Sequence, residues 1–353
     1  MSNITQIIEI NQPRLSICIA TYNRGKFIAK TLDSIICQMD SHVELVVVDG
    51  ASPDSTPDVM SQYLLRFPQI RYFREKQNSG VDCDYDKAVG YARGEFCWLM
   101  SDDDLLQPGA ISKVLYELSD KSDLVIVNAE VRNSDLSEVL VERKLNLISN
   151  KCYGRNESDE FFEECMNYLS YIGCVVIRRS CWLARNRENY YGSLFIHVGV
   201  IFQSPPVENV IVISDPLIVI RYGNAMWTAR GFEIWTFMWP ELVWSFISYS
   251  DATKQSVCNS SPWRKAKTLF YYRAIGVFSV VEFHKYLYHK TKGFNKLMAF
   301  IISNFPASIA NAISILYYVI FNRSSRMAQY DLLRSLHASW VSHFIGRLRQ
   351  SSR

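Results

Sequence analysis

Strand-like apolar runs alternate with segments of helical spacing over residues 15–131, and this alternation restricts the possible folds more than any other feature of the chain. The run VELVVVDG (43–50) is of the kind found in parallel strands that are covered on both faces. This order predicts a doubly wound, mostly parallel α/β sheet. The expected strands are 15–21, 43–50, 70–76, 95–100 and 123–131, and the expected helices are 25–39, 52–67, 84–94 and 107–118.

The remainder of the chain changes in character. Helical spacing at 158–169 and extended runs at 173–179 and 208–222 surround a stretch with no clear pattern, and from Gly231 onward the chain is helical and rich in aromatic residues. With 353 residues, it is long enough for one large domain and an appendage. We therefore expect a flexible lead-in over 1–12, an α/β domain over 13–228 and a helical region over 229–353.

Charge is distributed unevenly along the chain. Residues 254–353 hold 15 Lys and Arg against two acidic residues, a net charge of +13, so residues 1–253 carry −10 of the total of +3. Because the basic part is also rich in Trp, Tyr, Phe and Ile, an anionic membrane surface is a better expected partner than nucleic acid. Within it, the apolar stretch 297–321 is interrupted by Ser, Asn and Pro. We expect two interfacial or core-packed helices there rather than a membrane span, and a helical subdomain of a soluble protein is the alternative.

The cysteines and the N-terminal residues indicate the cellular compartment of the protein. The nine cysteines are scattered singly, with no C-x-x-C pair, which favours reduced thiols over a disulfide framework or a zinc site. The first 15 residues lack the basic, apolar and small-residue regions of a signal peptide. These features predict a cytoplasmic protein, peripheral on the inner face of the cell membrane.

Three adjacent carboxylates follow an expected buried strand in CWLMSDDDLL (97–106). Asp102, Asp103 and Asp104 repel one another, so a cation or water must compensate them. Hard cations such as Mg²⁺ or Mn²⁺ take oxygen ligands, and Mg²⁺ is usually held by one or two carboxylates together with substrate phosphates. The triplet therefore predicts a site for a metal-bound diphosphate; the alternative is a solvated turn before the helix at 109–118.

Three motifs resemble those of family 2 glycosyltransferases, which have the GT-A fold. They are LSICIATYNRGKFIAKTLDSI, VELVVVDGASPDST and ARGEFCWLMSDDDLLQPGAI, and they cover roughly residues 13–130. Within that family, the SDDD and GVDCDYDKAV segments look most like bacterial O-antigen sugar transferases of the abequosyltransferase-like group. The resemblance implies a GT-A-like, nucleotide-sugar-binding catalytic domain over 13–228 and an acceptor-side, membrane-associating region over 229–353.

The same resemblance implies roles for residues at three strand ends. Thr21, Tyr22 and Arg24 would line the nucleotide pocket. Asp49 would hydrogen-bond a pyrimidine, although it also suits a turn before Gly50, and Tyr22 suits simple packing. The remaining residues would come from the acidic triplet: Asp102 would reach the ribose and Asp103 would be the metal ligand of the D-x-D motif. The family often has an aspartate where this chain has Ser101, so metal ligation would depend on Asp103 with help from Asp104 or another residue.

The segment GVDCDYDKAV (80–89) adds further carboxylates. Asp82 and Asp84 are candidates for contact with the donor sugar or the base. In a helix, Asp82 and Asp86 would share a face, where like charges cost stability unless something binds them. Solvated acids at a helix start are the alternative.

No acidic pair stands where inverting members of the family place the general base, because GSLFIHVGVIFQ (192–203) contains no acid. His197 lies near that position. It is a candidate base, since imidazole titrates near neutrality, or a third metal ligand beside Asp103 and Asp104. An ordinary histidine on a mostly apolar strand is the third reading. The stereochemical outcome, inversion or retention, stays open.

The loop IRYGNAMWTARGF (220–232) combines Arg221, Trp227 and Arg230 around a glycine. Arginines on a flexible loop suit closure over a diphosphate, because guanidinium forks match phosphate oxygens. A plain linker between domains is the alternative.

Together these features, with the resemblance, imply a Mn²⁺- or Mg²⁺-dependent glycosyltransferase of O-antigen, lipopolysaccharide or other surface polysaccharide synthesis. It would move a sugar, for example a 3,6-dideoxyhexose such as abequose, from a CDP-, dTDP-, UDP- or GDP-linked donor to a polyprenyl-diphosphate-linked oligosaccharide. A nucleotidyltransferase is one alternative, but ATYNRG lacks the Gly-rich basic loop that holds a triphosphate. A non-catalytic, membrane-associated sugar-binding scaffold is the other.

Overall fold

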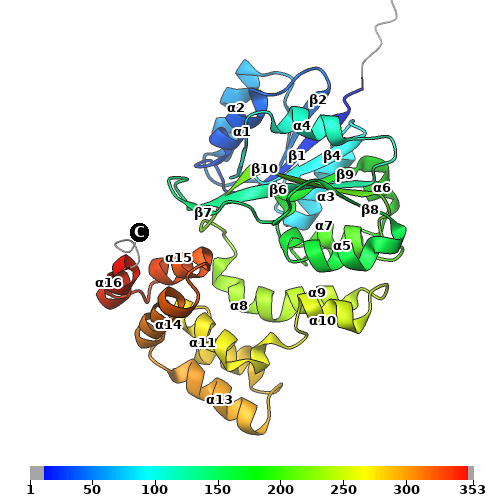
Figure 1. Cartoon of the computed structure of the whole chain (residues 1–353). Coiled ribbons are helices and arrows are strands. Elements are labelled where there is room, and N and C mark those ends of the chain that lie inside the picture. Colours follow the sequence, from blue (N-terminus) through cyan, green and yellow to red (C-terminus); the bar gives the residue numbers. More distant parts are fainter. Residues whose placement is uncertain (1–11, 349–353) are drawn as a thin grey trace, which may run out of the picture. The chain divides into compact units, whose positions relative to one another are not determined.

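The computed structural model describes residues 12–348, so the predicted lead-in over 1–12 lies almost entirely outside the described residues. The chain forms two compact units (Figure 1). The first contains the residues up to Glu130 and Glu142–Ile220, and the second contains Val131–Val141 and the chain from Arg221 onward.

The first unit is built on a mixed sheet with the strand order β3-β2-β1-β4-β9-β6-β10-β5. β1 pairs in parallel with β2 and with β4, and β2 pairs in parallel with β3, whereas β9 is antiparallel to both β4 and β6. The predicted α/β class with a helical C-terminal region is confirmed. The strands of the described chain are β1 Leu15–Thr21, β2 Val43–Asp49, β3 Arg71–Arg74, β4 Phe96–Met100, β5 Leu105–Leu106, β6 Leu124–Arg132, β7 Val139–Val141, β8 Lys151–Tyr153, β9 Val175–Arg178 and β10 Val210–Arg221. Of these, β7 belongs to the second unit, where it pairs with the end of β6.

The direction of each strand follows from where its chain enters the sheet. The first four strands in the order are joined through helices, which return the chain to the same edge, so they run in parallel. β9 instead enters beside the end of β4, where Val175 pairs with Leu99, and it therefore runs the other way. As a result, the residues just before β9 lie at the same edge as the residues that follow β1, β2 and β4.

Helices cover both faces of this sheet, with α1, α2 and α4 on one side and α3, α5 and α7 on the other (Figure 1). This explains the continuous apolar runs: every residue of β1 and of β4 is buried. The helices of this unit are α1 Ile28–Ile36, α2 Thr56–Arg66, α3 Val81–Tyr91, α4 Ala110–Glu117, α5 Ser158–Cys165, α6 Arg179–Ala184 and α7 Ile196–Phe202.

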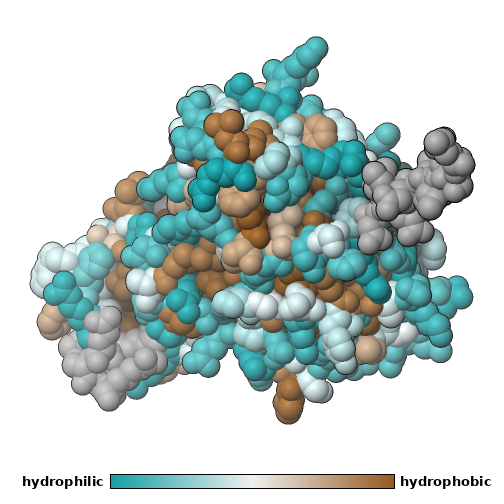
Figure 2. Space-filling model, turned by 90° about the horizontal axis from the view of Figure 1, so that it is seen from above, coloured by the Kyte–Doolittle hydropathy of each residue, from teal (hydrophilic) through white to brown (hydrophobic). Residues whose placement is uncertain are grey.

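The surface is mostly hydrophilic on the face shown in Figure 2, with apolar side chains in smaller groups between the polar ones. Among the exposed apolar residues of the first unit are Leu65, Tyr116 and Ile148, which come from separate segments of the chain. Scattered apolar residues of this kind are normal on protein surfaces and indicate no function by themselves.

The second unit is helical and has two apolar cores. One is built around Phe232, Phe278 and Phe283, and the other joins α11, α14 and α15 through Ala274, Ile315 and other small or aliphatic residues. The helices are α8 Gly231–Glu233, α9 Trp239–Ser245, α10 Asp251–Val257, α11 Ala266–Ile275, α12 Val280–Glu282, α13 Gly293–Asn304, α14 Ala307–Phe321, α15 Arg326–Arg334 and α16 Trp340–Leu348.

Residues 297–321 form two helices, as predicted, because Phe305 and Pro306 end α13 and begin α14. No single helix in the described part of the chain is long and apolar enough to cross a membrane. α13 and α14 meet the length and composition requirements only together, and they are bent by 101°.

Replacing Asp331 with asparagine is expected to flatten the dependence of stability on pH. Asp331 Oδ2 accepts hydrogen bonds from the hydroxyls of Tyr222, at 2.8 Å, and Tyr271, at 3.1 Å. Burial raises the pKa of Asp331 from 3.8 to about 6, and the two hydroxyls only partly oppose this rise. The folded state therefore holds the proton more tightly than the unfolded state. This contribution to the free energy of unfolding is fully present below pH 3.8 and is lost as the pH rises through 6.

The shift corresponds to at most about 3 kcal/mol. Urea unfolding between pH 4 and pH 7 measures it, with Asp251→Asn as the control, since the Asp251 side chain is 83% exposed. Wild type should lose stability over this range relative to Asp331→Asn but not relative to Asp251→Asn. Equal slopes for all three proteins would contradict the prediction.

Candidate active site

The loop after β1 is held by the start of α2. Asn23 takes the left-handed conformation, with φ of 59°, which asparagine tolerates better than most residues. The N–H of Arg24 donates to Thr56 Oγ1 and the N–H of Gly25 donates to Asp54 Oδ2, both at 2.9 Å. Asp54 Oδ1 in turn accepts from the Thr56 hydroxyl at 2.6 Å. This network fixes the backbone from which the Arg24 side chain extends.

Arg24 reaches two carboxylates of the acidic triplet. Its Nε lies 3.4 Å from Asp102 Oδ1, and its Nη2 lies 3.7 Å from Asp103 Oδ2. Asp102, Asp103 and Asp104 are 8%, 7% and 2% exposed, so the triplet is no solvated turn. Burial, together with the neighbouring charge of Asp103, raises the pKa of Asp102 to about 7, and Arg24 opposes this rise. The site therefore concentrates negative charge around a single arginine.

Ser101 also contributes to this cluster. Its hydroxyl donates to Asp103 Oδ1 at 2.6 Å, which orients the carboxylate that the sequence predicts as metal ligand. Asp104 is oriented differently, because Tyr171, in the loop before β9, donates its hydroxyl to Asp104 Oδ2 at 2.7 Å. The triplet is thus positioned partly by its own neighbour in sequence and partly by a residue 67 positions away.

Asp49, at the end of β2, is completely buried. Its Oδ1 accepts from the Ser52 N–H at 2.8 Å, which is the turn that the sequence allows, and its Oδ2 accepts from the Tyr72 hydroxyl at 2.6 Å. Arg74 Nε is 3.9 Å from the same oxygen. Burial, and then the bond to Asp49, raises the pKa of the Tyr72 phenol. Asp49 therefore stabilises the turn after β2, and its contact with a nucleotide base stays a prediction.

Asp84 lies close to the same strand end. A methyl group added at Gly50 would lie 2.5 Å from Asp84 Oδ2, so only glycine lets this carboxylate approach the backbone after β2. Asp84 Oδ1 accepts from the Ser79 hydroxyl at 2.8 Å, and Lys87 Nζ is 3.7 Å away. Burial raises the pKa of Asp84 despite these partners. The structure thus brings Asp84 next to Asp49.

Asp82 and Asp86 are occupied by protein groups. Both oxygens of Asp82 accept backbone N–H groups, from Leu194 at 2.9 Å and from Ile196 at 3.0 Å. Asp86 accepts from Trp182 Nε1 and forms an ion pair with Arg187, each at 2.8 Å. The like-charge cost predicted for this pair on α3 is therefore offset by donors from residues 182–196 rather than by a ligand.

His197 lies on helix α7, in the stretch that had no clear pattern in the sequence, and Asp82 accepts a backbone N–H from Ile196 at the start of this helix. The imidazole is 1% exposed, and its Nε2 is 2.7 Å from the carbonyl of Leu169. Burial lowers the pKa of His197 to about 4, so the ring is neutral at neutral pH. The catalytic and metal-binding roles of His197 stay predictions.

The predicted diphosphate loop belongs to the second unit. Arg221 is buried and donates through Nη1 to the carbonyl of Ser134 at 3.1 Å. Arg230 forms an ion pair with Glu233 at 2.8 Å, and Trp227 packs edge-on against Trp235. Each of these side chains thus has a partner within its own unit, and closure over a diphosphate stays a prediction.

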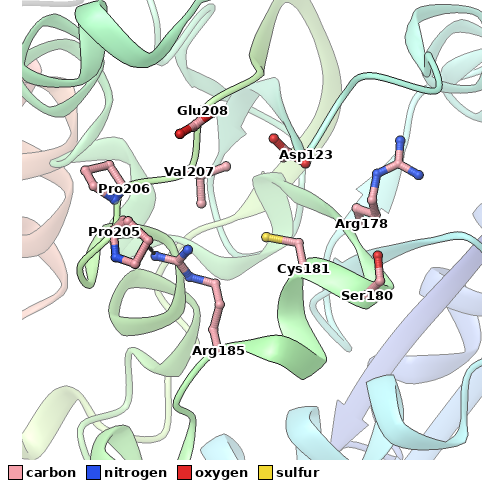
Figure 3. A pocket seen from close by; sticks show the side chains of 9 residues that line it. All are labelled: Asp123, Arg178, Ser180, Cys181, Arg185, Pro205, Pro206, Val207 and Glu208. Atoms are coloured by element: carbon pink, nitrogen blue, oxygen red, sulfur yellow. Dashed lines mark hydrogen bonds between the residues drawn. The ribbon is translucent and has the colours of Figure 1, made fainter.

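A cavity of about 370 Å³ lies elsewhere in the first unit (Figure 3). Its lining includes Arg178, which pairs with Phe96 at the start of β4, whereas the acidic triplet follows the end of that strand. Arg185, also in the lining, donates to the carbonyls of Val200 and Pro205. Because its arginines hold backbone carbonyls, this cavity is not the candidate active site.

The carboxylates suit a divalent cation by their donor chemistry. Arg24 lies beside two of the three buried carboxylates, and carboxylate oxygens are the ligands that Mg²⁺ and Mn²⁺ take. Among residues 12–348, no three His, Cys, Asp or Glu side chains converge as a ready-made metal site. The residues present fit a cation held by one or two carboxylates, with substrate oxygens completing its shell.

The arrangement of strands, helices and strand-end carboxylates defines an α/β protein of the GT-A type. Among solved structures, residues 1–349 of S. aureus TarS in complex with UDP give a TM-score of 0.51, covering 96% of this chain and 92% of that chain at 14% identity. At this identity, the likeness concerns the fold alone.

Residues 16–180 match the model of the family described as Glycosyl transferase family 2, and this part of the chain is a domain of that family. The abequosyltransferase RfbV of Salmonella typhimurium is 25% identical over 236 residues, which are 62% of this chain and 69% of that protein. Chondroitin synthase of Escherichia coli is 30% identical over 138 residues, 39% of this chain but only 19% of that protein. The chain is similar to both proteins over these lengths.

Four residues of the site were not singled out by the sequence reasoning: Asp54, Tyr72, Ser101 as an orienting group, and Tyr171. Asp54 had a local signal, since it precedes Ser-Thr at a helix start, where side-chain oxygens accept backbone N–H groups. Tyr72 and Tyr171 had none, because each meets its aspartate only through the pairing of strands.

Proposed function

We propose that this protein transfers a sugar from a nucleoside-diphosphate donor to an acceptor hydroxyl. The observation that carries the proposal is the meeting, at one edge of the sheet, of Arg24 with two buried carboxylates, Asp102 and Asp103. Buried like charges are costly to a fold, and carboxylates perturbed by burial and by a neighbouring charge cluster at functional sites, so this arrangement favours a phosphate-binding metal site over a structural role. The family of residues 16–180 agrees with this activity.

In this proposal, the donor lies across the ends of β1, β2 and β4. Asp49 and Asp84 face the base, Tyr22 and Thr21 line the pocket, and Asp102 accepts from the ribose. UDP in the TarS complex supports a nucleotide at this kind of fold. The acceptor oxygen forms a bond to the anomeric carbon as the bond from that carbon to the phosphate oxygen breaks, and the hydroxyl proton leaves to a base.

Mg²⁺ or Mn²⁺ would be held by Asp103, with Asp104 or Asp102 as a second carboxylate. When bound, such a cation neutralises the charge that develops on the leaving diphosphate. The chain's own contribution is orientation: Ser101 fixes Asp103, Tyr171 fixes Asp104, and Arg24 supplies a charged donor toward phosphate oxygens.

The acceptor that we propose is a polyprenyl-diphosphate-linked oligosaccharide in O-antigen or other surface polysaccharide synthesis. Its support is the similarity to the abequosyltransferase RfbV, so abequose is the first 3,6-dideoxyhexose to test. We place the reaction on the cytoplasmic face of the membrane. All nine cysteines are free thiols, five of them buried, which suits a reducing compartment.

A donor screen tests the proposal. CDP-, dTDP-, UDP- and GDP-sugars are added to the full chain with and without Mn²⁺, and the melting temperature is recorded. A ligand that binds the native state at 100 times its Kd stabilises it by about 2.7 kcal/mol, so the correct donor should raise the melting temperature, and more so with Mn²⁺.

The same mixtures are then assayed for nucleoside diphosphate. Its Mn²⁺-dependent release supports a transferase. Binding without any release, with acceptor present, would instead indicate the sugar-binding scaffold. Formation of pyrophosphate from a nucleoside triphosphate and a sugar phosphate would indicate the nucleotidyltransferase.

A further inference from the structure

Helix α14 exposes a stripe of aliphatic side chains. Ile309, Ile313, Leu316 and Ile320 are each between 44% and 50% exposed. Their spacing of four, three and four residues places them on one side of the helix. Four large apolar residues in a row on a free helix face are unlike the scattered exposed apolar residues of the first unit.

The opposite side of α14 is buried and mixed: Ala310, Ile315 and Val319 belong to an apolar core, whereas Asn311 and Ser314 are polar. Asn311 is completely buried: its Nδ2 donates to the carbonyls of Ala274, at 3.1 Å, and Leu332, at 2.9 Å. Its Oδ1 accepts from the Ser342 hydroxyl at 2.6 Å. A helix that faces water normally buries its apolar side and exposes its polar side. In α14 the exposed side is apolar as well as the buried side, which indicates that its outer side meets an apolar medium.

Helix α13 also exposes large apolar residues. Phe294, Leu297 and Ile301 are 79%, 55% and 56% exposed at spacings of three and four residues, while Ala299 and Ser303 are buried. Part of the large apolar surface of this helix therefore points outward, while Met298 and Ile302 pack against the core around Phe232. The two helices together form what we call the outer apolar face, defined by these three residues and the four of α14.

Cations stand at the edges of this face. Lys267 Nζ donates to the hydroxyl of Tyr317, the neighbour of Leu316, at 2.8 Å. Lys292 precedes α13 and Arg323 follows α14, and both are exposed. Over residues 254–353 the chain has 15 Lys and Arg against two acidic residues. An apolar stripe bordered by cations is the pattern of helices that lie in the interface of an anionic membrane.

We propose that the outer apolar face of α13 and α14 binds an anionic phospholipid bilayer, with both helices lying in the interface rather than crossing it. α14 has 15 residues, a length of about 22 Å, whereas a bilayer core is about 30 Å thick. A second copy of the chain suits the face less well, because two surfaces of the same strong positive charge repel each other. The proposal goes beyond sugar transfer and does not depend on it.

Vesicle co-sedimentation of the full chain tests this. The vesicles are pure phosphatidylcholine, or phosphatidylcholine with about 30% phosphatidylglycerol. The test variant is Ile313→Gln with Ile320→Gln, and the matched control is Leu65→Gln with Ile148→Gln, which are 87% and 100% exposed in the first unit. Wild type and control should bind the anionic vesicles, and the test variant should partition about tenfold less strongly.

Equal binding by the test variant and wild type would overturn the proposal, as would equal binding of wild type to neutral and anionic vesicles. Sedimentation velocity without vesicles tests whether a second copy of the chain occupies the face instead. If wild type is a dimer, the test variant is a monomer and neither binds vesicles, the face belongs to a second copy and the proposal is overturned. Nucleoside diphosphate release in detergent-free buffer should be the same for all three proteins, so failure here is distinguishable from failure of the proposed function.

Discussion

Replacing Asp103 with alanine is expected to abolish sugar transfer while leaving the fold intact. Asp103 is the carboxylate that Ser101 orients and that Arg24 reaches, and it is the proposed cation ligand. Loss of a group that stabilises charge in the transition state commonly costs about 10²–10³-fold in rate, and loss of the cation itself should cost more. Transfer is measured as nucleoside diphosphate release at saturating Mn²⁺.

The stability of the Asp103→Ala variant should not fall along with its activity. Asp103 adds negative charge beside Asp102 and helps to raise the pKa of that carboxyl to about 7. Without it, the repulsion in the buried triplet decreases, so the melting temperature without metal should be equal or higher. Asp120→Ala is the matched control, because it also removes one carboxylate, but one that is 96% exposed. Substantial turnover by Asp103→Ala, or turnover by wild type after chelation of metal, would contradict the proposed role of Asp103 as a cation ligand.

Replacing Arg24 with alanine is expected to destabilise the protein and to make it more dependent on a divalent cation. Arg24 lies 3.4 Å from Asp102 and 3.7 Å from Asp103, with all three side chains nearly buried. Removing one partner of a buried ion pair typically costs about 3–5 kcal/mol, because the remaining charge is left uncompensated. A bound cation would replace part of the lost charge. The rise in melting temperature on addition of Mn²⁺ should therefore be larger for Arg24→Ala than for wild type.

Two further variants make this test specific. Arg24→Lys keeps the charge and should lose less stability, although it cannot form the same fork. In the double variant Arg24→Ala with Asp103→Ala, the cost should be smaller than the sum of the two single changes, because the carboxylate that needed Arg24 is gone. Additive costs, with the same Mn²⁺ effect in every variant, would show that Arg24 does not compensate this cluster.

The candidate site was predictable from sequence to the extent that its residues follow strands. Thr21, Asp49 and Asp102 each come directly at or after the end of a strand whose apolar run is continuous, and parallel strands bring such ends to one edge. The orienting hydroxyls of Tyr72 and Tyr171 could not be predicted, because no local pattern marks a tyrosine that meets an aspartate 23 or 67 residues away.

The environment of His197 could also not be predicted from the residues next to it in the sequence. An apolar stretch of this length is compatible with a strand or a buried helix, and periodicity alone does not separate them. Asp82, 114 residues before Ile196, accepts a backbone N–H there and so selects the helix. The burial that lowers the pKa of His197 to about 4 follows from the same packing.

By itself, the sequence determined the α/β order, the edge at which the carboxylates collect, the break between α13 and α14 and the basic character of the second unit. These depend on periodicity, on proline and on charge, which are properties of neighbouring residues. Only the tertiary structure decided which oxygens are occupied. Asp82 and Asp84 share the first turn of α3, yet one holds the backbone at Leu194 and the other approaches Gly50. Successive helix positions point in different directions, so distant segments set the role of each side chain.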